Sequence, residues 1–143
     1  MTPADLARVH QAAFTVDRAW SASEFTQLLG QANVHLCGTL QCFALFRVLF
    51  DEAELLTIAT DPADQRRGWA RLTLQQAENS AATLGAEVMI LEVAEDNTPA
   101  RALYSAMGYH AIATRPRYYA RPNGIAADAL VLRKTIHPLN ARA

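Results

Sequence analysis

The stretch ELLTIATDPADQRRGWA, residues 54–70, contains two different patterns separated by a turn. Its first half, ELLTIAT, is apolar and rich in β-branched residues, which is typical of a buried strand. After the turn at Asp61-Pro62, apolar residues recur at helical spacing from Ala70 to Leu84, and Gly85 ends the run. The stretch therefore predicts a strand that turns into the longest helix of the chain.

The turn QRRGWA, residues 65–70, has a composition that suits an anion. The N-terminus of a helix offers free N–H groups and the positive end of the helix dipole. Gly68 leaves room for a phosphate near the backbone, and Arg66 and Arg67 add positive charge. A pyrophosphate site is one interpretation; an ordinary loop with solvated arginines is the other. A P-loop is excluded, because its Gly-Lys-Ser/Thr ending is absent.

The patterns on either side extend this motif to one α/β domain over residues 1–143 with a mixed sheet. They predict two helices, three strands, the long helix, a strand, a helix capped by Thr98, and two strands. The segments that carry these patterns are 2–14, 21–30, 33–38, 42–50, 53–60, 61–85, 87–93, 98–108, 109–119 and 127–134.

The length, charge and apolar content of the chain indicate a single globular domain of ordinary composition. A length of 143 residues suits one domain with a proper core. The net charge of −1 gives no strongly basic surface for nucleic acid. With no membrane-length apolar run and no signal-peptide pattern, a cytoplasmic protein is expected, without a nucleic-acid or membrane partner. Cys37 and Cys42 are expected to be buried free thiols. No metal site is expected, because the histidines, His10, His35, His110 and His137, lack metal-ligand spacing.

A carboxylate and a phenol stand out in VMILEVAEDNTPARALYSAMGY, residues 88–109. Glu92 interrupts an apolar strand, where poor solvation would make its carboxylate a stronger base. The alternative is a carboxylate that faces solvent at the end of the strand. Tyr104 lies in the helix that follows, either as a core aromatic with a hydrogen-bonded hydroxyl or as a proton donor.

The order of these motifs resembles the GCN5-related N-acetyltransferases (GNAT family) over nearly the whole chain. Gln65, Gly68 and Ala70 match that family's acetyl-CoA pyrophosphate pattern, Gln/Arg-x-x-Gly-x-Gly/Ala. The stretches AWSASEF, LEVAEDNTPARALYSAMGY and RYYARPNG are most similar to the ribosomal-protein-alanine N-acetyltransferase (RimI-type) branch. The resemblance implies a GNAT fold: a mixed, mostly antiparallel twisted sheet of about six to seven strands, splayed between its fourth and fifth strands, with helices on both faces.

The resemblance also implies roles for individual residues. Glu92 takes the position of the general base and Tyr104 that of the general acid. Trp20, Tyr118 and Tyr119 lie in segments that border the acceptor. The positions implied for cofactor binding are Ile58, Ala59, Thr60, Gln65, Arg66, Arg67, Gly68, Trp69, Ala70, Arg71, Asn97 and Tyr104.

The implied reaction moves acetyl from acetyl-CoA, without a metal, to an α-amino group by direct attack in a ternary complex. The expected acceptor is a peptide or protein N-terminus, namely the N-terminal alanine of a small-subunit ribosomal protein. Neither cysteine is expected in the reaction centre. Two segments near the acceptor depart from the branch, which usually has proline at the positions of Ala19 and Ala120. Two alternatives stay open: an enzyme that acetylates small-molecule amines or lysine side chains, and a non-catalytic acetyl-CoA-binding or interaction domain.

Overall fold

The computed structural model describes residues 1–136, so His137 lies outside the described part. The helices and strands follow one another in the order that the sequence predicts. They are α1 Pro3–Ala13, α2 Ala22–Leu29, β1 Val34–Gly38, β2 Cys42–Leu49, β3 Glu52–Thr60, the 3₁₀ turn Pro62–Asp64, α3 Trp69–Thr83, β4 Val88–Ala94, α4 Thr98–Ala106, β5 His110–Tyr119 and β6 Ala127–Thr135.

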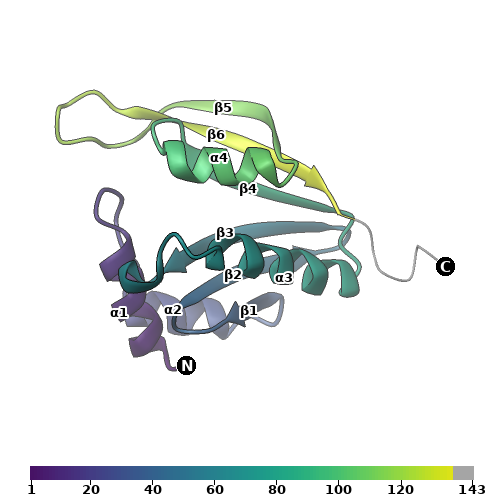
Figure 1. Ribbon diagram of the computed structural model, residues 1–143. Helices are drawn as coiled ribbons and strands as arrows, with labels where there is room; N and C mark the ends of the chain where they lie inside the picture. Colours follow the sequence, from purple (N-terminus) through teal and green to yellow (C-terminus); the bar gives the residue numbers. More distant parts are fainter. Residues whose placement is uncertain (137–143) are drawn as a thin grey trace.

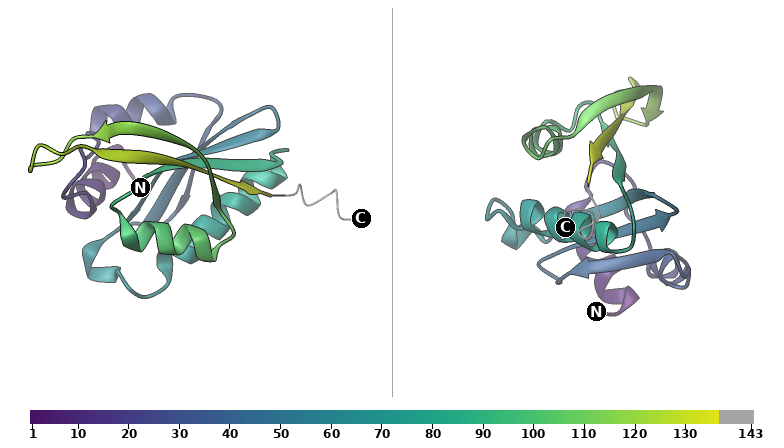
Figure 2. Two further views of the ribbon diagram at one scale, coloured as in Figure 1. Left: turned by 90° about the horizontal axis from the view of Figure 1, so that it is seen from above. Right: turned by 90° about the vertical axis from the view of Figure 1, so that its right-hand side faces the viewer.

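The six strands form one mixed sheet in the order β1-β2-β3-β4-β6-β5 (Figure 1). Only β3 and β4 are parallel, and they pair over just three residues each, Glu52–Glu54 with Val88–Ile90. Beyond these pairs the strands diverge and divide the sheet into two wings, β1–β2–β3 and β4–β6–β5 (Figure 2). The expected GNAT fold is confirmed. The splay lies between the third and fourth strands, so its expected position between the fourth and fifth was wrong.

A β-bulge in β3 accounts for the divergence. The pairing of β2 with β3 skips Leu56, because Phe46 lies opposite Leu55 and Leu45 opposite Thr57. An extra residue bends a strand and reverses which face its later side chains occupy. Leu55 accordingly packs with the core around α3, whereas Thr57 contacts α1. The bend begins just after Glu54, the last β3 residue paired with β4.

Helices cover both faces of the first wing. One core cluster lies between α1, α2 and the first three strands and includes Leu6, Phe25 and Phe43. The larger cluster joins α3 to β2 and to the second wing, through residues such as Leu74 and Leu91. No helix within residues 1–136 is long and apolar enough to cross a membrane.

A polar network braces the closed end of the splay. The Tyr109 hydroxyl donates to Oε2 of Glu78 at 2.7 Å, and the Lys134 ammonium donates to Oε1 at 2.7 Å. Burial, and next the negative charge of Glu78, raise the pKa of Tyr109. Glu78 is only 6% exposed, and hydrogen bonds from these two partners offset the cost of burying its carboxylate. The network ties α3 in the first wing to β6 in the second.

Candidate active site

The N-terminus of α3 has backbone N–H groups with no capping side chain. Gly68 occupies the N-cap position in the left-handed conformation, with φ at 80°. The other three α-helices are capped by side chains, those of Thr2, Ser21 and Asn97. A Cβ added to Gly68 would meet no atom within 4 Å, so the space in front of the helix is open. The geometry fits the predicted anion site.

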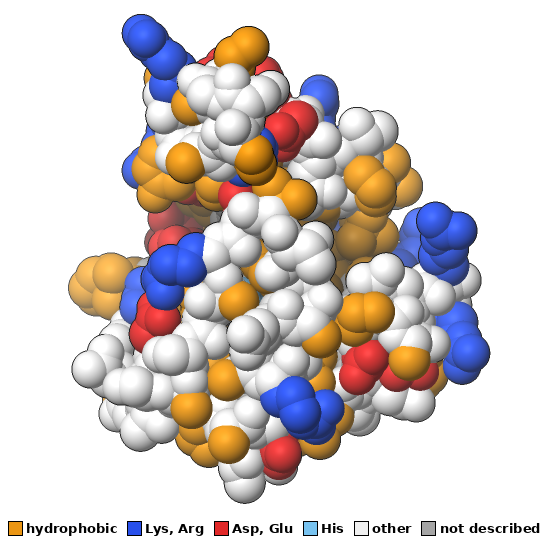
Figure 3. Space-filling view, turned by 90° about the vertical axis from the view of Figure 1, so that its left-hand side faces the viewer, with side chains coloured by type: hydrophobic (Ala, Val, Ile, Leu, Met, Phe, Trp, Pro, Cys, Tyr) orange, Lys and Arg blue, Asp and Glu red, His pale blue; other side chains and the backbone are white. Residues whose placement is uncertain are grey.

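The residues around Gly68 place positive charge beside these N–H groups. Arg66, with φ at 65°, and Arg67 are exposed, and Arg67 lies 3.8 Å from the carboxylate of Asp64. Gln65 and Arg71 are also exposed, whereas Trp69 and Ala70 are half-buried. Figure 3 looks onto the open end of the splay, where Lys and Arg side chains project at the rim. The seven residues from Gln65 to Arg71 that were predicted to bind the cofactor make up the turn before α3 and the first residues of that helix.

The end of β3, with Ile58, Ala59 and Thr60, lies along the mouth of the splay. In the described part of the chain this segment pairs with β2 alone. Its edge toward β4 therefore presents backbone groups that a ligand in the splay could bind. Thr60 donates its hydroxyl hydrogen to Sγ of Cys42 at 3.2 Å.

Cys42 begins β2 and lies opposite Thr60 of β3. Its charged form would raise the pKa of Tyr104, and it accepts the hydrogen bond from Thr60. Its residue is only 1% exposed, so the thiol is closed off from an incoming thioester. Cys37 and Cys42 are both free thiols, as predicted, but only Cys42 is buried, whereas Cys37 is half-buried.

Tyr104 projects from α4 into the core beneath the splay. It is 6% exposed, and its ring packs edge-on against Tyr109 at 5.7 Å between centroids. Burial raises its pKa to about 12, so the phenol keeps its proton at neutral pH. Its hydroxyl has no hydrogen-bond partner among residues 1–136, yet no described polar side-chain atom is both fully buried and unpaired. The ring of Tyr104 therefore belongs to the core, while its hydroxyl is free to donate a hydrogen bond.

Glu92 lies on the face of β4 opposite the buried residues Met89, Leu91 and Val93. Its side chain is 28% exposed, and its Oε1 lies 3.0 Å from Nε of Arg115 on β5. The expected poorly solvated carboxylate is therefore not observed, because Glu92 has both partial exposure and a cationic partner. Arg115 was not predicted from the sequence, because it lies 23 positions from Glu92 and belongs to no motif.

Tyr119 is a half-buried residue at the end of β5, and its ring packs edge-on against Tyr118. Its pKa rises to about 12, mainly through burial and next through the negative charge of Glu92. Tyr119 in turn is among the neighbours whose charge raises the pKa of Tyr104. Tyr118 points away and is 53% exposed, with the Arg115 guanidinium 5.6 Å from its ring centre.

Trp20 and Asn97, which were predicted to bind the acceptor and the cofactor, both have structural roles. The Trp20 backbone N–H donates to Nδ1 of His10, whose other nitrogen lies 2.9 Å from the Thr57 hydroxyl. Burial lowers the pKa of His10 to about 4, so its ring is neutral and holds the α1–α2 loop to β3. Asn97, where the sequence predicted Thr98, is the N-cap of α4. Within residues 1–136 no group of three or more potential metal ligands occurs.

Comparisons with known proteins agree with this geometry. The family model described as "Acetyltransferase (GNAT) family" matches residues 3–109. A protein of Haemophilus ducreyi named [Ribosomal protein bS18]-alanine N-acetyltransferase is 34% identical over 131 residues, which cover 89% of either chain. The crystal structure of the ribosomal-protein-S18-alanine N-acetyltransferase from Escherichia coli superimposes with a TM-score of 0.85 at 28% identity, covering 94% of this chain and 88% of that one. Arabidopsis thaliana NAA60 in complex with acetyl-CoA shares the fold, with a TM-score of 0.77 at 16% identity over 95% of this chain and 96% of that one.

Proposed function

The chain belongs to the GNAT family and is an acetyl-CoA-dependent N-acetyltransferase, and we propose that its acceptor is the N-terminal alanine of a small-subunit ribosomal protein. The relatives named for this reaction support the proposal, since one of them matches 89% of the chain at 34% identity. An α-amino group at a chain end is also the acceptor that fits a splay open at one end, because the peptide behind it can leave through the opening.

Acetyl-CoA lies in the splay in this proposal, with its pyrophosphate at the N-terminus of α3. The observation that carries it is the uncapped, exposed turn at Gly68 with Arg66 and Arg67 beside it. The free N–H groups donate to the phosphates, and the arginines offset their charge. The pantetheine arm then runs along the unpaired edge of β3 from Ile58 to Thr60, with Asn97 on the opposite wall. The backbone edge binds its amides as another strand would.

Glu92 removes a proton from the acceptor ammonium, directly or through one water. The neutral amine attacks the thioester carbon and a new C–N bond forms. The nitrogen loses its second proton to water, and the C–S bond breaks as the intermediate collapses to the amide. Tyr104 gives its proton to the departing thiolate, which suits a phenol whose pKa of about 12 keeps it protonated. The guanidinium of Arg115, whose Nε lies 3.0 Å from Oε1 of Glu92, orients the carboxylate that accepts this proton.

Trp20, Tyr118 and Tyr119 form the acceptor side. Exposed Tyr118 offers a ring to the peptide, and half-buried Tyr119 packs edge-on against it. Trp20 anchors the α1–α2 loop through His10. We place the enzyme in the cytoplasm, where acetyl-CoA and ribosomal proteins are both available. The free thiols of Cys37 and Cys42 suit a reducing compartment.

The experiment follows acetyl-CoA consumption with a peptide that copies the alanine-starting N-terminus of a ribosomal protein bS18. Wild type is compared with Glu92→Gln and with Glu95→Gln, a control that removes an exposed carboxylate nearby. We expect Glu92→Gln to lower kcat roughly 10²- to 10⁴-fold and the control to leave it within about twofold.

Two parallel acceptors test the rival assignments. A peptide with an internal lysine and a blocked N-terminus, and a free polyamine, are assayed under the same conditions. A higher kcat/KM for either acceptor would move the assignment from α-amino groups to that class. Binding of acetyl-CoA without turnover of any acceptor would instead favour a non-catalytic domain.

A further inference from the structure

Arg121 in the β5–β6 loop holds two carboxylates at once. Its side chain is only 8% exposed. Nε and one terminal nitrogen donate to both oxygens of Asp96, at 2.7 and 2.8 Å, in the paired geometry that guanidinium favours. The other terminal nitrogen donates to Oδ1 of Asp17 at 2.8 Å and to the carbonyl of Ala120 at 2.9 Å. We call Arg121, Asp17 and Asp96 the Arg121 clamp.

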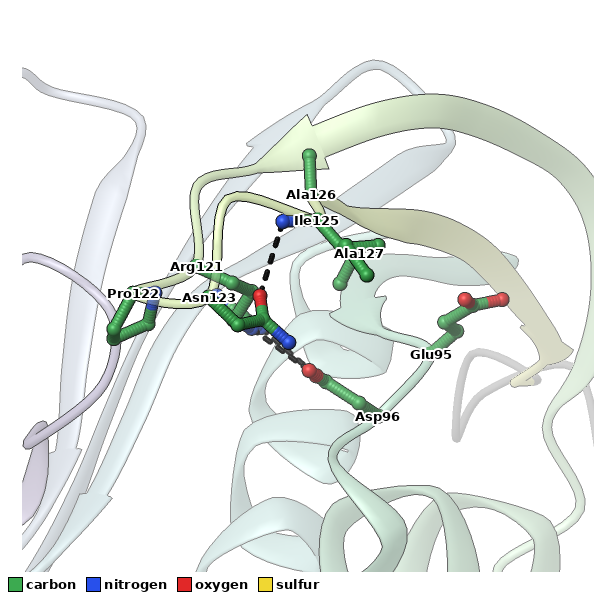
Figure 4. Close-up of a pocket in the computed structure, with 8 residues that line it drawn as sticks. All are labelled: Glu95, Asp96, Arg121, Pro122, Asn123, Ile125, Ala126 and Ala127. Atoms are coloured by element: carbon green, nitrogen blue, oxygen red, sulfur yellow. Dashed lines mark hydrogen bonds and ion pairs between the residues drawn. The ribbon is translucent and has the colours of Figure 1, made fainter.

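The Arg121 clamp joins three loops at the open end of the splay. Asp17 lies between α1 and α2 in the first wing. Asp96 lies between β4 and α4 in the second wing, and Arg121 between β5 and β6. Figure 4 shows Arg121 directed at Asp96, with Pro122 and Asn123 at the tip of the loop. The clamp thus links the two wings where β3 and β4 no longer pair.

Each member of the clamp is a near neighbour of a residue proposed for binding or catalysis. Tyr119 is two residues before Arg121, whose guanidinium carbon lies 5.5 Å from its ring centre. Asn97 follows Asp96, and Trp20 is three residues after Asp17. A displacement of the clamp therefore moves the acceptor side directly and the cofactor side only through Asn97.

We propose that Arg121 is a positioning residue, which fixes the α1–α2 and β5–β6 loops at one separation and so shapes the entrance for the acceptor chain. The inference rests on the proposed function, because it takes these loops as the acceptor walls. The guanidinium is the only positive group that the structure places between Asp17 and Asp96 in residues 1–136. Without it two carboxylates face each other across the entrance, and their repulsion separates the loops.

The kinetic test compares wild type with Arg121→Gln and Asp17→Asn. We expect each variant to raise the KM for the alanine-starting peptide about tenfold, with kcat and the KM for acetyl-CoA within about threefold. The double variant should be no worse than Arg121→Gln alone, because both changes remove the same contact. Arg121→Lys keeps the charge and loses the forked geometry, so its KM should lie between those of wild type and Arg121→Gln.

Hydrogen exchange of the free enzyme provides a readout without any acceptor. Arg121→Gln should speed exchange about tenfold in both residues 14–20 and residues 120–126. The matched control is Arg18→Gln, which breaks the exposed Arg18–Glu24 pair in the same loop and should leave residues 120–126 unchanged. Asp17→Asn serves if Arg121→Gln does not fold, since the pair with Asp96 is retained.

The inference is overturned if residues 14–20 exchange at the wild-type rate in Arg121→Gln, or if the KM changes of the two single variants multiply in the double variant. A wild type that binds acetyl-CoA and leaves the alanine-starting peptide unmodified would instead refute the proposed acceptor. In that case hydrogen exchange alone tests the role of the Arg121 clamp. Faster exchange in both loops of Arg121→Gln supports the role, and faster exchange in only one loop refutes it.

Discussion

Replacing Gly68 by alanine separates the stability of the α3 turn from its affinity for acetyl-CoA. At φ of 80° an alanine is strained by about 1–2 kcal/mol, because its Cβ approaches the neighbouring carbonyl oxygen. Beyond Gly68 and its two chain neighbours no atom lies within 4 Å of the added carbon, so the unliganded enzyme gains no tertiary clash. We therefore expect the melting temperature of Gly68→Ala to fall by roughly 2–8 °C.

The same methyl group has a separate effect on binding. Strain present in both the free and the bound enzyme cancels in the binding equilibrium, so a change in Kd reports contact with the ligand. A methyl group between the pyrophosphate and the helix N-terminus removes one charge-assisted hydrogen bond, worth about 1.5–3 kcal/mol. That loss raises the Kd for acetyl-CoA roughly 10- to 150-fold.

Gly85→Ala at the other end of α3 is the matched control. Gly85 has φ of 99° and equally open surroundings, so the strain is comparable, while the site is a helix length away. Calorimetric titration with acetyl-CoA and thermal unfolding are measured on both variants. If Gly68→Ala weakens binding no more than Gly85→Ala does, the pyrophosphate does not lie at this turn.

Three further outcomes follow from the structure. Tyr104→Phe should lower kcat about 10- to 100-fold and leave the acetyl-CoA KM nearly unchanged in steady-state assays; an unchanged kcat would exclude Tyr104 as the acid. Since burial lowers the His10 pKa from about 6.5 to about 4, the unfolded chain binds the extra proton, and stability falls as pH drops through that window; urea unfolding of His10→Gln should lose this slope. Tyr109→Phe leaves Glu78 with one partner and should cost about 1–3 kcal/mol in urea unfolding, whereas an unchanged midpoint would show that water replaces the hydroxyl.

The order of helices and strands could be predicted because its signals are local. Thr2 caps α1 and Ser21 caps α2 through capping boxes, and Gly68 marks the turn before α3. Each signal depends on residues within a few positions of one another, which a sequence displays directly. Asn97 shows the limit of this reading, since it caps α4 one residue before the predicted Thr98.

The surroundings of the site depend on contacts between distant segments. Arg115 lies 23 positions from Glu92, and Arg121 lies 104 from Asp17, so neither ion pair has a pattern in the sequence. The run VMILEV reads as uniformly buried, although in the sheet it buries one face and exposes Glu92 on the other. The bulge in ELLTIAT also has no signal in the sequence. Apolar residues occur on both sides of Leu56, so the pattern does not show that the buried side chains change from one face of the sheet to the other at this point.

Each wing of the splayed sheet is built from one continuous part of the chain. Everything up to Gly85 belongs to the first wing and everything from β4 to Thr135 to the second, and the described backbone crosses between them once, at residues 84–88. A ligand in the splay touches both wings and acts as a removable crosslink between the two halves of one polypeptide. At a hundred times its Kd such a crosslink adds about 2.7 kcal/mol to the folded state. In the proposed binding mode, a higher concentration of acetyl-CoA therefore also raises the free energy of unfolding of the enzyme.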